Sequence, residues 1–391
     1  MSLTAVSSPG EPYGGRLVDL EVAPGEAQQK LGEAGELTKT QPFIDFVYDT
    51  EKIAVGAYSP LEGFMDSATF HKVTSEGRLP NGLPWTIPVV MSVKKDQAKG
   101  IHEGERVALL DWGDRVFATL DVSEIYALPK EEFAQGAYGT TDRNHPNVAD
   151  IFNNYGDTAL AGKVTLLRRL DLPMVAHEMT PKETRELFRR KGWRNVVAYQ
   201  CRNPPHTAHE YIQKVSLERS DIDGLLVQPV IGRLKKGDYK PAVIMEAYRQ
   251  VVDGYYPKDR VVLSSLSITM RYGGPKAALL LAIIRKNFGA THYIVGRDQA
   301  GVGKYYDPYA CHEIFDRFDI GITPLRYMET FYCKVCRAMA TAKTCPHREE
   351  EHLAVSQTRM RQLLQEGKEL PMEILRPEVI AILKQGDATL T

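Results

Sequence analysis

The pattern of hydrophobic and polar positions changes near residue 170 of the chain. Before residue 150 the helical spacing of apolar residues is weak, and segments of strand-forming residues prevail. Residues 106–111 and 115–128 flank the turn sequence Gly113-Asp114, which predicts a hairpin, and residues 85–93 (WTIPVVMSV) predict another strand. We therefore expect residues 1–168 to form a β-rich, mostly antiparallel and barrel-like domain.

Beyond residue 170, short apolar strands alternate with amphipathic helices. Thr180-Pro181-Lys182-Glu183 is a capping box with proline at the first helical position, so we expect a helix there that Gly192 closes. This alternation predicts a parallel, doubly wound, Rossmann-like sheet in a central α/β domain of residues 169–325. The further predicted elements are strands at 195–199, 224–230, 261–267 and 293–295, and helices at 207–220, 241–252 and 275–287.

In a sheet of this kind, ligands bind beyond the carboxyl ends of the strands. Several loops follow predicted strands and should meet at that edge, namely residues 200–206, 232–238, 269–274 and 296–303. From about residue 326 the alternation stops, and a cysteine-rich loop precedes helices predicted at 357–365 and 377–384. We assign residues 326–391 to a small C-terminal domain.

Composition adds few constraints. The 391 residues are too many for one small core, and the 43% hydrophobic and 25% charged content is ordinary for a globular protein. A formal net charge of −1 gives no general attraction to nucleic acid or to an anionic membrane. The longest apolar run, Ala277 to Ile284, is too short to span a membrane, and residues 1–15 lack the features of a signal peptide. We therefore expect a cytoplasmic protein with neither kind of partner.

The densest group of chemically active side chains is the segment at residues 200–209, QCRNPPHTAH. Arg202 can hold a tetrahedral oxyanion with two hydrogen bonds, and the amides of Gln200 and Asn203 can donate without adding charge. The alternative is a surface loop in which Arg202 pairs with a nearby carboxylate.

His206 and His209 lie three positions apart at the predicted start of a helix, so they share one face. They could be metal ligands, general bases or donors to phosphate groups. The nearby arginine and the helix N-terminus, which attracts anions, favour phosphate. Pro204 and Pro205 stiffen the loop and reduce the entropy that binding would cost.

A second glycine-rich loop, residues 296–303 (GRDQAGVG), also follows a predicted strand. Its glycines allow backbone N–H groups to approach a ligand closely, and Arg297 adds a second cation. The spacing matches neither the P-loop nor the dinucleotide-binding pattern, so a plain tight turn is the alternative. Residues 270–275 form a third loop, which is either another anion site or a helix entry.

The cysteine cluster carries the strongest metal signal. Cys333 and Cys336 have C-x2-C spacing, Cys345 follows nine residues later, and thiolates in this pattern suit tetrahedral zinc. His347 is the nearest fourth ligand and His352 is the alternative. With four protein ligands the site would be structural; the other interpretation is a set of reduced thiols.

Together, these motifs resemble the ATP sulfurylase (sulfate adenylyltransferase) family over nearly the whole chain. The resemblance implies a PUA-like N-terminal domain, a nucleotidyltransferase central domain, and reversible formation of adenosine 5′-phosphosulfate and pyrophosphate from ATP and sulfate with Mg²⁺. The cysteine loop is similar to the zinc loop of some prokaryotic members, which also suggest a homodimer. The matching sequences are residues 57–65 (AYSPLEGFM), 200–209, 270–303 and 356–361 (SQTRMR, near the SGT-x-x-R of the family).

The resemblance also implies roles for single residues. Sulfate would be held by Gln200, Arg202, Arg297 and the backbone of Ala300. ATP would be held by Asn203, His206, His209, Gly296, Arg297, Asp298 and Gln299, with Met328 near the adenine. The implied catalytic group is Cys201, Arg202, Asn203, His206 and His209. The chain departs from the family at Cys201, often threonine, at Gln299, often histidine, and at Gln357, usually glycine.

The implied chemistry agrees with the residue types. Sulfate is fully ionised at neutral pH, so the reaction needs positioning and charge stabilisation rather than a general base. A rival is another nucleotidyltransferase or an aminoacyl-tRNA synthetase-like adenylating enzyme, with a carboxylate or phosphate as acceptor. A second rival, a nucleic-acid binder with a zinc ribbon, is disfavoured by the near-neutral charge.

Overall fold

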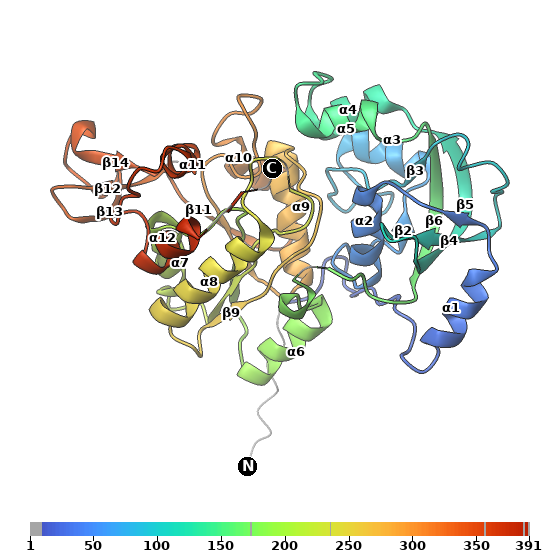
Figure 1. Ribbon diagram of the computed structural model, residues 1–391, viewed down its shortest axis with the longest axis horizontal. Coiled ribbons are helices and arrows are strands. Elements are labelled where there is room, and N and C mark those ends of the chain that lie inside the picture. The colour runs from blue at the N-terminus through green and yellow to red at the C-terminus, as the bar shows by residue number, and fades with distance from the viewer. Residues whose placement is uncertain (1–9, 173, 235, 356, 386–387, 390–391) are drawn as a thin grey trace, which may run out of the picture.

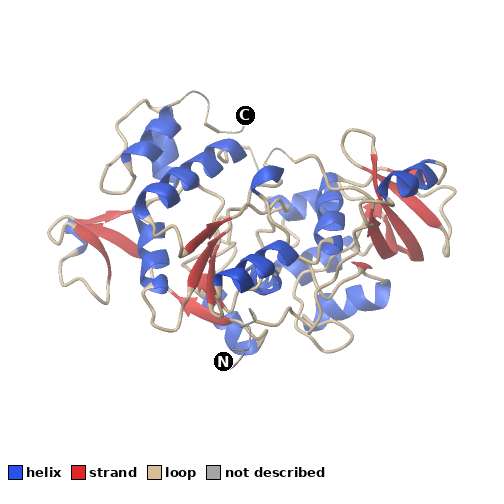
Figure 2. Ribbon diagram, turned by 90° about the horizontal axis from the view of Figure 1, so that it is seen from below, coloured by secondary structure: helices blue, strands red, loops and turns tan. Residues whose placement is uncertain are grey.

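The chain forms three sheets that lie in sequence order along the molecule (Figure 1). The structure, a computed structural model, describes residues 10–172, 174–234, 236–355, 357–385 and 388–389, and Ser356 of the SQTRMR segment lies outside them. Figure 2 shows the parallel strands in the middle, the larger N-terminal sheet at one end and a small sheet at the other. No helix within the described ranges combines the length and the apolar character needed to cross a membrane.

The N-terminal sheet has six strands in the order β1-β4-β5-β6-β2, with β3 pairing β6. Pairing is antiparallel except between β1 and β4. The predicted hairpin is confirmed as β4 and β5, and the buried carboxylate of Asp111 closes its turn by accepting from the N–H groups of Gly113 and Arg115. The strands are β1 (Lys39–Thr40), β2 (Gly63–Phe64), β3 (Ser92–Val93), β4 (Arg106–Leu110), β5 (Val116–Ala127) and β6 (Thr158–Leu166).

Two expectations for this region were wrong. Of residues 85–93 only β3 forms a strand; the residues before it are largely buried, but Pro84 and Pro88 lack the N–H that a sheet ladder needs. The region also contains helices that the weak periodicity did not reveal. In α2 every residue from Asp45 to Ala54 is buried, and a helix buried on all sides has no polar stripe. These helices are α1 (Ala27–Gly35), α2 (Ile44–Ala54), α3 (Ser67–Glu76), α4 (Lys130–Tyr138) and α5 (Pro146–Asn153).

The central sheet is parallel throughout and has the order β11-β10-β7-β8-β9. The chain enters at β7, continues outward through β8 and β9, and then crosses to β10 on the other side. The strand order therefore reverses between β7 and β10, the place where such sheets bind ligands. The predicted strands are confirmed as β7 (Val196–Tyr199), β8 (Gly224–Val227), β9 (Val261–Leu263) and β10 (His292–Val295); the edge strand β11 (Thr323–Arg326) was not predicted.

The helices of this region follow the predictions closely. The helix at Pro181–Lys191, α6, has the expected capping box, and Gly192 ends it with a φ of 69°. Helix α9 is buried along most of its length and lies between the central sheet and the N-terminal region (Figure 1). The other helices are α7 (Thr207–Leu217), α8 (Pro241–Tyr255), α9 (Gly274–Asn287) and α10 (Ala310–Arg317), of which α10 was not predicted, and a short 3₁₀ turn, Val175–His177, precedes α6.

The N-terminal region anchors the loops that follow β8 and β9. The buried carboxylate of Asp45 in α2 accepts from Arg233 at 2.7 Å and from Thr269 at 2.8 Å. Asn147 in α5 accepts from the N–H of Tyr272 at 2.8 Å and donates to the carbonyl of Met270 at 3.2 Å. These contacts hold two strand-end loops against the N-terminal region.

The C-terminal region carries a three-stranded antiparallel sheet of order β13-β12-β14. Both predicted helices are confirmed, and α12 packs on α8. The elements are β12 (Thr330–Cys333), β13 (Ala338–Thr341), a 3₁₀ turn (Glu349–Glu351), β14 (His352–Ala354), α11 (Gln357–Gln365) and α12 (Pro377–Lys384). The domain limits 1–168, 169–325 and 326–391 stay a prediction, which limited proteolysis would test.

Candidate active site

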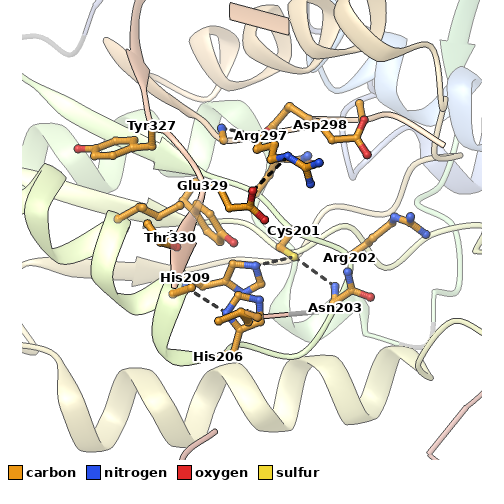
Figure 3. Close-up of a pocket in the computed structure, with 18 of the residues that line it drawn as sticks. Cys201, Arg202, Asn203, His206, His209, Arg297, Asp298, Tyr327, Glu329 and Thr330 are labelled. Atoms are coloured by element: carbon orange, nitrogen blue, oxygen red, sulfur yellow. Dashed lines mark hydrogen bonds and ion pairs between the residues drawn. The ribbon is translucent and has the colours of Figure 1, made fainter. Parts of the chain in front are cut away.

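A cavity of about 320 Å³ opens at the carboxyl ends of β7 and β10 (Figure 3). It lies where the order of the central strands reverses, so both adjacent strand-end loops reach it. The structure brings together every predicted substrate residue of these loops: Gln200, Cys201, Arg202, Asn203, His206, His209, Gly296, Arg297, Asp298, Gln299, Ala300 and also Met328 line the cavity.

The first loop leads from buried strand β7 into helix α7, whose N-cap is His206. Nδ1 of His206 accepts from the backbone N–H of His209 at 3.2 Å, and the two rings stack with centroids 3.4 Å apart. Burial, and then the neighbouring His209, lower the pKa of His206 well below its usual value. His206 is therefore neutral at pH 7, and because Nδ1 accepts a hydrogen bond, its proton sits on Nε2.

The start of α7 is less open to anions than the sequence suggested. The N–H of Thr207 donates to the carbonyl of Ile374 at 2.8 Å, and that of His209 donates to His206. Two of the N–H groups that a helix start normally offers to a ligand are thus taken by the protein. An anion at this point would have to be held by the imidazoles instead.

Arg202 lies beside a buried carboxylate. Its Nη1 is 3.1 Å from both oxygens of Asp238, which is fully buried, and 3.3 Å from the hydroxyl of Tyr272. The guanidinium also lies over the Tyr272 ring, 4.8 Å from its centroid. Arg202 therefore does pair with a nearby carboxylate, as the alternative interpretation held. Its side chain still lines the cavity and is 22% exposed.

Arg361 is a third cation near the cavity that the sequence analysis did not assign to the site. Its Nη2 donates to Oδ1 of Asn203 at 2.7 Å and lies 3.3 Å from Asp238. Asp238 and Tyr272 were likewise missed as single residues, although both belong to loops predicted at the sheet edge. Arg361 lies in the SQTRMR segment. The sequence therefore contained a signal for Arg361, Asp238 and Tyr272, because each belongs to a segment that had been singled out.

Backbone conformation shapes the second loop, which follows β10. Asp298 and Ala300 have φ values of 52° and 58°, in the left-handed region that residues with a side chain rarely occupy. The N–H of Asp298 donates to the carbonyl of Pro308 at 2.7 Å, and the carbonyl of Ala300 accepts from Gly274 at 3.0 Å. A Cβ on Gly301 would lie 1.9 Å from Oδ1 of Asp298, so a larger residue there would force the Asp298 carboxylate to move.

The side chains of the second loop differ in how far the protein already uses their hydrogen-bonding groups. Arg297 is nearly half exposed, and its Nε lies 3.6 Å from a carboxylate oxygen of Glu329. Gln299 instead accepts from the N–H of Gly296 at 3.3 Å and donates to the hydroxyl of Tyr293 at 2.8 Å. Both ends of the Gln299 amide are thus used within the protein, whereas Arg297 has a long contact that a ligand could replace.

Two residues that line the same cavity carry buried polar atoms without protein partners. Oε1 of Gln200 and Nδ1 of His209 are both buried, and neither has a hydrogen-bond partner among the described residues. Both residues line the cavity. Buried polar groups are normally hydrogen-bonded, so the cavity wall holds polar atoms whose hydrogen-bonding capacity the described residues leave unused.

Cys201 lies between the two halves of the first loop. Its sulfur is 3.7 Å from Nε2 of His209 and accepts from the N–H of Asn203 at 3.4 Å (Figure 3). Burial raises the pKa of this thiol, but His209 and the Asn203 N–H together outweigh burial and lower it to about 6.

The cysteine cluster assembles as a four-ligand site at the C-terminal sheet. Nδ1 of His347 lies 3.5, 3.3 and 3.5 Å from the sulfurs of Cys333, Cys336 and Cys345, and the last two sulfurs are 3.9 Å apart. Tetrahedral zinc with bonds of about 2.0–2.3 Å needs ligand separations of roughly 3.5–3.8 Å, so this cluster could bind a metal such as zinc. His347 is the histidine that lies within this group, whereas His352 stacks on Phe331 and its Nε2 is 3.7 Å from the sulfur of Cys345.

The fold and the cavity define a nucleotidyltransferase of the α/β class with a PUA-like N-terminal domain. The family described as ATP-sulfurylase matches residues 176–386, and the PUA-like domain matches residues 10–169. The chain belongs to the ATP-sulfurylase family, and the fold class predicted from the sequence is confirmed.

Curated relatives extend the match over nearly the full length. The sulfate adenylyltransferase of Pyrococcus abyssi is 44% identical over 378 residues, covering 96% of this chain and 98% of the relative. That of Symbiobacterium thermophilum is 45% identical, with 96% and 95% covered. A solved structure titled hexameric APS kinase from Thiobacillus denitrificans is 26% identical, with a TM-score of 0.76 over 95% of this chain and 67% of that chain.

Proposed function

We propose that this cavity is where the chain, a sulfate adenylyltransferase, forms adenosine 5′-phosphosulfate and pyrophosphate from ATP and sulfate. The observation that carries the proposal is the meeting of two loops, 200–209 and 296–301, in one cavity at the reversal of strand order. One loop brings histidines and the other brings an accessible arginine and a shaped backbone. A single cavity can then hold the nucleotide and the oxyanion side by side.

In this proposal sulfate lies at the mouth of the second loop. Arg297 exchanges its long contact with Glu329 for the oxyanion, and the backbone of Ala300 adds a donor. Gln200 and Arg202 approach from the first loop. Because Nη1 of Arg202 is directed at Asp238, sulfate would contact the remaining edge of that guanidinium.

ATP occupies the rest of the cavity, with its phosphates against His206, His209 and Asn203. Neutral His206 would donate from Nε2 to the oxygens that become pyrophosphate. Gly296 lets the nucleotide approach closely, since a Cβ there would meet no protein atom within 4 Å. Residues Arg297, Asp298 and Gln299 would border the nucleotide, and the exposed Met328 would lie against the adenine.

The reaction is a direct displacement at the α-phosphorus. A sulfate oxygen forms the new bond to phosphorus, the bond between the α-phosphorus and its bridging oxygen breaks, and pyrophosphate leaves with the electron pair. Sulfate has no proton to lose at neutral pH, so the residues contribute orientation and charge stabilisation. Bound with ATP, Mg²⁺ would neutralise phosphate charge; the carboxylates of Asp298 and Glu329, which line the cavity, are the oxygen ligands it prefers.

The four-ligand cluster would hold a structural zinc ion that fixes the C-terminal loop. Metal analysis of purified protein should find about one zinc per chain. The variant His347→Gln should lose it, whereas the matched variant His352→Gln should keep it. Zinc retained by His347→Gln and lost by His352→Gln would reverse the assignment. We also propose a homodimer, which light scattering of the purified chain would test.

Pyrophosphate release from ATP, measured with and without sulfate, tests the proposed function. Release should depend on sulfate and should also occur with molybdate as a second tetrahedral oxyanion. Release that needs a carboxylic acid or a phosphate acceptor instead would assign the chain to another adenylating class.

A further inference from the structure

Cys201 differs from the other cysteines of the chain in its access to the cavity. Its side chain lines the cavity and is only half-buried. Cys311 is buried, and its sulfur donates to the carbonyl of Gly296 from behind the second loop. The remaining three cysteines, Cys333, Cys336 and Cys345, belong to the four-ligand cluster.

The surroundings of Cys201 stabilise a sulfur anion. From α7, Nε2 of His209 lies 3.7 Å away, and the N–H of Asn203 donates to the sulfur at 3.4 Å. The other titratable groups that face it are the buried hydroxyls of Tyr199 in β7 and Tyr248 in α8. Burial first, and then the charge of Cys201, raise the pKa of both tyrosines well above the usual value, so they stay neutral.

The same cavity offers polar atoms to an incoming molecule. Oε1 of Gln200 is buried without a described partner, and Gln200 itself is 9% exposed at the cavity wall. Nδ1 of His209, whose Nε2 is the atom near Cys201, is unpartnered as well. The cavity of about 320 Å³ that Cys201 lines gives a small polar reagent room beside the sulfur, next to a wall with unused polar atoms.

We propose that Cys201 is a covalent modification site, at which small soft electrophiles that enter the cavity are attacked by the thiolate of the Cys201–His209 pair. With iodoacetamide the sulfur forms a bond to the methylene carbon while the carbon–iodine bond breaks, and iodide leaves with the electron pair. The adduct then fills space that ATP and sulfate need. This last consequence, loss of substrate binding, rests on the proposed function.

The size of the effect follows from the thiolate fraction. A thiol of pKa about 6 is half ionised at pH 6, whereas an ordinary thiol of pKa about 8.5 is ionised to about 0.3%. The lower pKa also reduces the intrinsic nucleophilicity, by roughly tenfold over this range. Cys201 should therefore react about tenfold faster than an ordinary thiol at pH 6, an advantage that shrinks toward pH 8.

Alkylation of the full, zinc-loaded chain tests the proposal. Limiting iodoacetamide is added between pH 5 and pH 8, and the labelled cysteines are identified by mass spectrometry of peptides. The rate at Cys201 should rise with a midpoint near pH 6 and exceed that of free cysteine about tenfold at pH 6, while buried Cys311 serves as the internal control. Labelling of Cys201 no faster than Cys311, or a midpoint above pH 8, would overturn the proposal.

Two variants test whether the reactivity of Cys201 comes from its contact with His209 or only from its exposure to solvent. His209→Gln should move the labelling midpoint upward by more than one pH unit, because the contact with His209 that lowers the pKa of the Cys201 thiol is lost; an unmoved midpoint contradicts the role given to His209. Cys201→Ser should abolish labelling at this peptide and leave Cys311 unchanged. Because labelling is read by mass, neither result depends on catalytic activity.

Protection by substrate distinguishes this inference from the proposed function. A non-hydrolysable ATP analogue with Mg²⁺ should slow labelling of Cys201 at least tenfold. Labelling that follows the expected pH profile but is not slowed would uphold the modification site and refute ATP binding at the cavity. Slowed labelling, with sulfate-dependent turnover lost in step with adduct formation, supports both.

Discussion

The two loops that reach the cavity keep their shapes by different means. The loop after β7 depends on side chains: His206 caps α7 and stacks on His209, and Arg202 pairs with buried Asp238. The loop after β10 depends on its backbone, with two residues in the left-handed region and Gly301 packed against Asp298. We therefore expect the first loop to be disrupted by the loss of single side chains, and the second by changes to its turn.

The largest expected effect belongs to the first loop. His206→Asn should lower turnover by roughly 10²-fold or more, the usual cost of losing a donor to transition-state charge. Asparagine still caps a helix but loses the buried stack on His209, so the free energy of unfolding should fall by about 0.5–3 kcal/mol. Steady-state kinetics and denaturant unfolding give the two values. Wild-type turnover in His206→Asn would remove the histidine from the mechanism, and a larger stability loss would mean that its main role is structural.

In the second loop, substitutions at two glycines test two different roles: Gly301 in the shape of the turn and Gly296 in leaving space for the ligand. Gly301→Ala forces the exposed Asp298 carboxylate to move and should cost up to about 1 kcal/mol of stability with a loss of activity. Gly296→Ala meets no protein atom within 4 Å, so the chain should fold normally while KM for ATP rises several-fold. Thermal unfolding together with KM for each substrate tests the pair. Equal behaviour of the two variants would contradict the distinction.

Substituting Arg202 should destabilise the fold more than substituting Arg297 does. Arg202→Ala leaves the buried Asp238 with one cation fewer and should cost about 1–3 kcal/mol. Arg297→Ala breaks only a long, exposed contact and should cost less than about 1 kcal/mol, while KM for sulfate rises markedly. Urea unfolding of both variants, beside sulfate titrations, measures the contrast. A destabilised Arg297→Ala with unchanged KM would reverse it.

The smallest expected effect is a pH dependence of stability. Burial, and then His209, keep the pKa of His206 below its usual value near 6.5, so below that pH the unfolded chain binds the extra proton. The unfolding free energy should therefore fall as pH decreases below 6.5, by up to about 1.4 kcal/mol per unit from this residue. His206→Asn should lack this part of the slope. Parallel curves for both proteins between pH 5 and 7 would contradict the buried neutral imidazole.

Much of the central sheet could be predicted because its strands and helices have distinct periods and clear start signals, as at Thr180 and Gly192. Helix α2 could not, since burial on all sides removes the polar stripe, and edge strand β11 contains Pro324 and only one buried residue. The predicted site residues gather at one cavity because strand ends meet in parallel sheets.

The hydrogen-bond and ion-pair partners of those site residues could not be predicted from the sequence. Asp238 lies 36 residues from Arg202, and Arg361 lies 158 residues from Asn203, so their contacts depend on how separate loops meet. The same holds for the start of α7, where the carbonyl of Ile374 takes an N–H that the sequence assigned to phosphate. Local pattern predicts which side chains reach a site, and tertiary packing decides which remain available.

Isotope exchange between pyrophosphate and ATP tests most directly the claim that both substrates meet in one cavity and react without an intermediate on the protein. If sulfate attacks the α-phosphorus itself, label should pass from pyrophosphate into ATP only when sulfate is present. The same exchange rate in the absence of sulfate would show that a residue of the chain takes the adenylyl group first, and would contradict the account.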